Sequence, residues 1–117
     1  MTDKPPGPWS KPDAPGFGVA RPPAVATLQL ENESVRVTRW DFEPGAATGW
    51  HRHGLDYVVV PVTDCTMLLE EPGGTSRTVN TQKGVAYARV AGMEHNVING
   101  GDVPMAFVEI ELLSRPG

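Results

Sequence analysis

The chain has 117 residues, the length of a single domain with a modest core, and its 13 glycines and 12 prolines favour turns and short strands over long helices. Its formal net charge is -4, and it has no cluster of lysine and arginine. It therefore lacks the basic surface that is typical of proteins that bind nucleic acid or the membrane surface. With no membrane-length apolar stretch, no apolar signal-peptide core and one cysteine, Cys65, the sequence predicts a cytoplasmic protein whose partner is a small molecule.

Residues 1–23 differ from the rest of the chain, because they hold seven of the 12 prolines. Proline has no amide donor for a sheet, so this segment predicts an extended arm in front of one folded domain that spans residues 24–117. Trp9 and Phe17 are the side chains that would anchor the arm to its own domain or to a second subunit. A disordered tail is the alternative.

From residue 24 onward, short apolar runs alternate with turn residues at the spacing of an all-β protein. The strands that this pattern predicts cover residues 25–30, 34–42, 48–53, 57–62, 66–70, 76–81, 84–90, 95–98 and 105–113. There is no amphipathic helix pattern. We therefore predict one small antiparallel β-barrel or jelly roll.

Four local features of the sequence carry further expectations. The run 57–62 is almost continuously apolar and β-branched, which predicts burial on both faces or cover by the arm. The Asn-Gly-Gly-Asp sequence at 99–102 is the strongest hairpin signal in the chain, because these residues tolerate positive φ. In the last strand, alternation places Phe107, Glu109 and Glu111 on one face. Cys65, next to a turn, is expected to be a small apolar filler.

The three histidines of the chain have the spacing of metal ligands. His51 and His53 are two residues apart, so in a strand they point to the same face, about 6.6 Å apart along it. His95 must come from another strand. Neutral imidazoles bind zinc or iron at about 2.0–2.1 Å and leave positions open for water or substrate. The sequence therefore predicts a metal site made of His51, His53 and His95.

The same histidines belong to two longer motifs, Gly45-x5-His51-x-His53 and Gly84-x5-Val90-x-Gly92-x2-His95-x3-Asn99. These resemble, in order, the two motifs of the cupin superfamily. The second matches at every position except Val90, where cupins usually have proline. The first lacks the glutamate that follows the second histidine, because Tyr57 and Val58 occupy its places.

Asp56 lies one residue before those places and is the carboxylate nearest to the missing ligand in the sequence. It shares a strand face with Val58, which leaves it near the site but with a shorter reach. Direct ligation by Asp56 is one interpretation. A turn-capping role, or a role behind the ligands, is the other.

The resemblance implies a cupin jelly roll around one divalent metal ion. Because many cupins are dimers, it also implies a homodimer. The arm is a candidate for the segment that crosses between the subunits. Within the superfamily, His-Arg-His followed by Asp-Tyr-Val-Val-Val at 56–60 makes the chain similar to the short bacterial group named after a beta-alanine degradation protein. Our first hypothesis is a metal-dependent oxidoreductase, an Fe(II) dioxygenase-like enzyme resembling other three-histidine cupins. Its substrate would be a small carboxylate or carbonyl compound, and Zn²⁺, Mn²⁺ and Ni²⁺ are the alternatives to Fe²⁺.

Two other functions are compatible with the same residues. In a metal-dependent lyase or isomerase, the ion stabilises an enolate while Tyr57 or Tyr87 moves a proton. In a non-catalytic binding module, the barrel and the metal are kept but nothing is turned over. The missing glutamate supports this last alternative.

A substrate pocket needs polar side chains near the ligands, and the candidates are Tyr57, Tyr87, Arg39, Arg89 and Glu109. Tyr87 and Arg89 share one face of a strand, so a carboxylate clamp with a phenol beside it is one interpretation. For Arg39 and Arg89 we favour the other interpretation, a surface position.

Overall fold

The computed structural model describes residues 20–113, and every regular element in this part of the chain is a β-strand. The strands are β1 (Val25–Glu31), β2 (Val35–Phe42), β3 (His51–Arg52), β4 (Tyr57–Pro61), β5 (Cys65–Glu71), β6 (Thr75–Thr81), β7 (Tyr87–Arg89), β8 (Glu94–Asn99) and β9 (Met105–Leu112). The predicted all-β fold is confirmed. Within residues 20–113 there is no helix that could span a membrane. The predicted arm lies outside the described residues, apart from residues 20–23.

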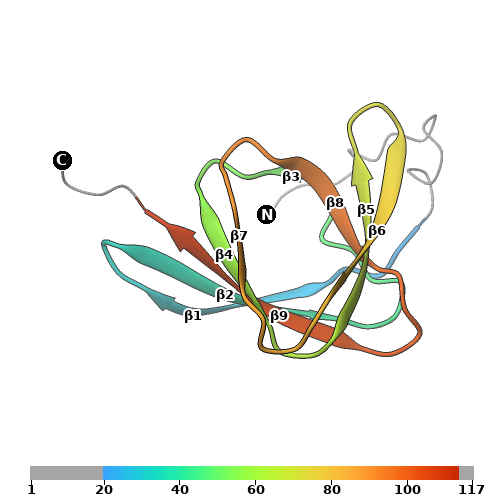
Figure 1. The fold of residues 1–117 in the computed structure, drawn as a ribbon, viewed down its shortest axis with the longest axis horizontal. Coiled ribbons are helices and arrows are strands. Elements are labelled where there is room, and N and C mark those ends of the chain that lie inside the picture. Colours follow the sequence, from blue (N-terminus) through green and yellow to red (C-terminus); the bar gives the residue numbers. More distant parts are fainter. Residues whose placement is uncertain (1–19, 114–117) are drawn as a thin grey trace.

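The strands form two antiparallel sheets that face each other (Figure 1). The larger sheet has the order β1-β2-β9-β4-β7 and the smaller one β3-β8-β5-β6. The chain crosses between the sheets at most of its connections, which is the topology of a jelly roll. As a result β3 and β8, which are far apart in the sequence, lie side by side, and they face strands of the larger sheet.

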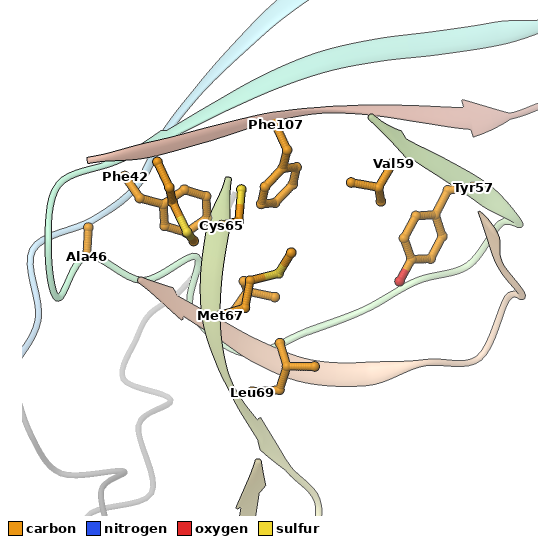
Figure 2. Packing of buried hydrophobic residues seen from close by; sticks show 10 residues of the cluster. Phe42, Ala46, Tyr57, Val59, Cys65, Met67, Leu69 and Phe107 are labelled. Carbon is orange, nitrogen blue, oxygen red and sulfur yellow. The ribbon is translucent and has the colours of Figure 1, made fainter. Parts of the chain in front are cut away.

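Apolar side chains from both sheets fill the space between them (Figure 2). The buried members of this cluster are Phe42, Ala46, Tyr57, Val59, Cys65, Met67, Leu69, Val97, Met105 and Phe107. The rings of Phe42 and Phe107 pack with centroids 5.4 Å apart, and Tyr57 lies at the other end of the cluster (Figure 2). Removing such a ring from a core costs about 3–5 kcal/mol, so this cluster supplies a rigid frame for polar groups beside it. Cys65 is buried in the cluster, as expected for a small apolar filler.

Alternation along β9 decides which of its polar residues face this interior. Phe107 pairs with Trp40 of β2, and Glu109 pairs with Val59 of β4. Phe107 and Val59 are both core residues, and Glu109 is two residues beyond Phe107, so its side chain lies on the same inner face. The predicted division of this strand into two faces is confirmed.

One expectation about local structure was wrong, and two others hold only in part. Residues 99–102 do not form a hairpin, since β8 and β9 belong to different sheets and neither Gly100 nor Gly101 has positive φ. A Cβ on Gly100 would lie 3.3 Å from the Cβ of Leu68, so this glycine allows a close approach to β5. The buried residues of β4 alternate with half-buried ones, so full burial on both faces is not observed, and the alternative, cover by the arm, lies outside the described residues. The strands predicted over 48–53 and 84–90 shorten to β3 and β7.

Candidate metal centre

The smaller sheet brings two of the histidines opposite each other. His51 of β3 pairs with His95 of β8, and cross-strand partners point to one face of a sheet. Backbone bonds continue past the end of β3: the His53 N–H donates to the Met93 carbonyl (2.8 Å), and the Gly92 N–H donates to the His53 carbonyl (2.7 Å). His53 therefore keeps the strand geometry and faces the same way as His51.

The three imidazole rings converge through their Nε2 atoms. The Nε2 of His53 lies 3.0 Å from that of His51 and 3.1 Å from that of His95. The rings meet edge to face, with interplanar angles of 73° to 84°. Among residues 20–113, these three histidines form the group of potential ligand atoms close enough to hold one ion. The predicted cluster is thus assembled by the fold.

The Nδ1 atoms of two rings contact acceptors that place their hydrogen away from the cluster. His51 Nδ1 lies 2.9 Å from the Gly49 carbonyl oxygen, which can only accept. His53 Nδ1 lies 3.3 Å from Glu109 Oε2, a close polar contact just beyond the usual hydrogen-bond length. With the hydrogen on Nδ1, a neutral imidazole presents a lone pair at Nε2. His95 Nδ1 is buried with no hydrogen-bond partner among the described residues.

Burial keeps the three rings neutral. It lowers the pKa of His53 and of His95 to about 3, with the neighbouring histidines adding to the effect, and it also lowers the pKa of His51. With their hydrogens on Nδ1, His51 and His53 have no hydrogen to share at Nε2, and a cation supplies the missing attraction. Ligand nitrogens at about 2.1 Å from one ion are about 3.0–3.4 Å apart. The three rings therefore fit a single divalent metal ion.

Glu109 reaches this cluster from the opposite sheet. Its Oε2 contacts His53 Nδ1, and its Oε1 accepts a 3.0 Å hydrogen bond from Trp40 Nε1. Burial raises the pKa of the Glu109 carboxyl to about 7, against the opposing effect of the Trp40 bond. Glu109, a candidate substrate-binding residue from the sequence, thus has both carboxyl oxygens in contact with protein groups. A carboxylate behind a histidine orients the ring and increases its basicity as a ligand.

Tyr57 is the aromatic residue in direct contact with the cluster. Its ring stacks on His53 with centroids 4.0 Å apart and planes 20° from parallel. On β7, Arg89 pairs in register with Tyr57, and its guanidinium lies 4.6 Å from the ring centroid of Tyr87. The positive charge of Arg89 contributes to the lowered pKa of His95, although burial is the largest cause. Tyr57 and Tyr87 therefore face the core between the sheets. Arg89 is exposed, and its Nη1 donates to the Ala88 carbonyl at 2.9 Å, which agrees with the surface interpretation.

Asp56 and Arg39 are not brought to the cluster. Asp56 Oδ1 accepts the backbone N–H of Ala91 at 2.8 Å, which is the turn-capping role weighed from the sequence. Arg39 alternates with Trp40 along β2 and therefore lies on the outer face, where it pairs with Asp41 at 3.1 Å. The surface interpretation holds for Arg39.

Trp40 is a functional neighbour that the sequence analysis did not single out. Its spacing from Phe42 indicates an inner face, but an inward tryptophan is most often a core residue. The bond to Glu109 depends on the pairing of β2 with β9, which brings residues 69 positions apart into contact. No local pattern indicates that pairing.

Comparison with known proteins identifies the family. No family model matches the chain. The beta-alanine degradation protein BauB of Pseudomonas aeruginosa PAO1 is 56% identical over 92 residues, which cover 79% of this chain and 96% of that protein. The crystal structure of a cupin domain from Bordetella pertussis Tohama I is 54% identical, with a TM-score of 0.78, and covers 83% of this chain and 100% of its own. The chain belongs to the cupin superfamily.

The fold of this cupin also extends to proteins with little sequence similarity. The polyketide cyclase RemF from Streptomyces resistomycificus has a TM-score of 0.62 at 20% identity, over 85% of this chain and 73% of its own. At that identity the likeness shows the fold alone. The chemistry of the cupin therefore has to be argued from its own site.

Proposed function

We propose that this cupin is a metal-dependent enzyme with Fe(II) dioxygenase-like activity on a small carboxylate or carbonyl compound. The observation that carries the proposal is the convergence of the Nε2 atoms of three buried, neutral histidines, with no carboxylate in the ligand group. An ion held only by neutral donors keeps its full positive charge, which favours an anionic or enolisable substrate.

The choice of metal follows from the donor set. When bound, a divalent ion supplies Lewis acidity, and iron(II) adds one-electron chemistry with dioxygen. Imidazole suits iron, zinc and nickel alike, and iron is the ion among them that adds chemistry with dioxygen. Fe²⁺ is our first choice. Zn²⁺, Mn²⁺ and Ni²⁺ are the alternatives, since affinity alone does not select iron.

A small carboxylate suits the residues beside the cluster. The similar Pseudomonas protein is named for beta-alanine degradation, and beta-alanine carries a carboxylate. In the proposal, the Arg89 guanidinium binds the substrate carboxylate, and the Tyr57 and Tyr87 phenols donate hydrogen bonds to it. Burial raises the pKa of both tyrosines to about 12, so both phenols keep their hydrogen at neutral pH.

Oxygen uptake by the iron-loaded protein, over a panel of small carboxylates, tests this function. Wild type should consume oxygen with one of them, and Arg89→Ala should raise its KM about tenfold or more with a smaller change in kcat. The reason is that a hydrogen bond to a charged group contributes about 1.5–3 kcal/mol. Arg39→Ala is the matched control, because Arg39 is paired with Asp41 on the outer face and should leave both constants unchanged.

The same panel separates the alternatives. Turnover without oxygen, supported by Zn²⁺, Mn²⁺ or Ni²⁺, would replace the proposal with a lyase or isomerase. Tight retention of a ligand without product, under every gas and metal condition, would replace it with a binding module.

The homodimer and the cytoplasmic location are retained as parts of the proposal. Both rest on the resemblance and the composition. Light scattering on the purified protein measures its mass in solution, and a monomeric mass would contradict the proposed homodimer.

A further inference from the structure

Two polar side chains are buried on the outer side of the smaller sheet, behind the histidines. Glu70 of β5 and Asn96 of β8 pair across the strands and are 3% and 6% exposed. Asn96 follows His95, so alternation places its side chain on the face opposite to the metal site. Burying a carboxylate and an amide is costly unless their hydrogen bonds are satisfied. The hydrogen-bond partners of Glu70 and Asn96 therefore show which part of the structure the pair stabilises.

The hydrogen bonds of this pair lead to His51. Asn96 Nδ2 donates to Glu70 Oε1 at 2.9 Å. Asn96 Oδ1 accepts the backbone N–H of Gly49 at 2.9 Å. The carbonyl of Gly49 in turn lies 2.9 Å from His51 Nδ1, where it accepts the ring hydrogen. Glu70, Asn96 and Gly49 thus form a continuous chain to one of the three ligands.

Both the backbone conformation of Gly49 and the hydrogen bonds to its peptide groups fix this residue in place. Its φ is +88°, in the left-handed region that favours glycine. Its carbonyl is also held by the Thr48 hydroxyl at 2.9 Å, and that hydroxyl accepts the N–H of Val97 on β8. The turn between the sheets is therefore tied to β8 through both its amide and its carbonyl, and this fixes the acceptor that His51 meets.

We propose that Glu70 and Asn96 are positioning residues that fix Gly49, so that its carbonyl holds His51 as the Nδ1–H tautomer with Nε2 toward His53 and His95. The ring orientation of a ligand histidine is set by the partner of its other nitrogen. The inference rests on the metal-binding part of the proposed function and not on the reaction. It assigns a role to Glu70, which lies outside both cupin motifs, and to Asn96, which lies within the second.

The chain supplies a matched control on the same strand. Asn99 is also buried, at 2% exposure, and its side chain bonds to the backbone of Phe42, Gly101 and Val103. None of these bonds reaches a histidine. Asn99→Ala therefore removes a buried amide from β8 without touching the chain to His51.

Two measurements on metal-stripped protein test the proposal. In Zn²⁺ titrations against a competing chelator, Asn96→Ala should bind about 10- to 100-fold more weakly than wild type, the range typical of residues that orient a ligand. Glu70→Gln keeps an oxygen for Asn96 Nδ2 and should bind nearly as tightly as wild type. Asn99→Ala should lower the melting temperature and leave the Zn²⁺ affinity unchanged. Nitrogen-15 NMR should show His51 as Nδ1–H in wild type and Asn99→Ala, and a shift toward Nε2–H in Asn96→Ala.

The proposal requires the affinity loss and the tautomer shift together, and either one alone would overturn it. Circular dichroism checks folding, and Glu70→Leu, which leaves Asn96 without its acceptor, replaces Asn96→Ala if that variant does not fold. Failure of the wild type to bind Zn²⁺ would remove the proposed metal site. The tautomer of His51 would still show whether Asn96 positions the ring.

Discussion

Replacing His95 with alanine should lower metal affinity about 100-fold or more and leave a folded β-rich protein. A four-ligand zinc site contributes about 10–16 kcal/mol of binding free energy, so one ligand accounts for about 3 kcal/mol. His95 supplies one of three Nε2 atoms, and the described structure offers no fourth protein ligand in the group. The core between the sheets does not depend on this ring. Elemental analysis of protein purified without chelator, together with circular dichroism, measures both effects.

Glu94→Ala is the control for the His95 variant. Glu94 is the neighbouring residue on β8, is exposed, and pairs in register with Arg52. Its removal perturbs the same strand without removing a donor atom, so metal content should stay at the wild-type level. Full metal occupancy in His95→Ala would mean that His95 is not a ligand.

Glu109→Ala should weaken metal binding about 10- to 100-fold, the range typical of carboxylates that contact a ligand histidine from behind. Without Glu109 Oε2, the Nδ1 hydrogen of His53 loses the oxygen that lies 3.3 Å away, and the ring is free to change its tautomer. The imidazole then presents its Nε2 lone pair for only part of the time. Chelator competition with Zn²⁺ measures the loss.

Glu111→Gln is the control for this second variant. Glu111 is two residues farther along the same face of β9, and its side chain pairs with Arg36 at 2.9 Å rather than with a histidine. Its affinity for Zn²⁺ should match the wild type. If Glu109→Ala and Glu111→Gln bind Zn²⁺ equally well, Glu109 does not orient His53.

The metal ligands could be predicted from the sequence because their signal is mostly local. The two-residue spacing of His51 and His53 fixes a shared face in a strand. The motif spacing around His95 indicated a second strand, and the pairing of β3 with β8 then brought the rings together. Strand alternation likewise placed Glu109 on the inner face, but its contact with His53 required the order of strands in the two facing sheets.

Features that depend on long-range pairing could not be read from the sequence. The bond from Asn96 to Glu70 joins two strands through a register that no local pattern encodes. Asp56 was compatible with ligation and with turn capping until the Ala91 N–H was located. The hairpin predicted at 99–102 had suitable turn residues, but β8 and β9 pair with other strands in different sheets. In each case the tertiary arrangement outweighed a valid local preference.

X-ray absorption at the metal edge of the loaded protein tests most directly whether three imidazoles hold one ion. We expect three imidazole nitrogens at about 2.1 Å in wild type, two in His95→Ala, and no protein sulfur or carboxylate oxygen at the ion. A spectrum with carboxylate or sulfur ligands in place of imidazole, or one that does not change in His95→Ala, would contradict it.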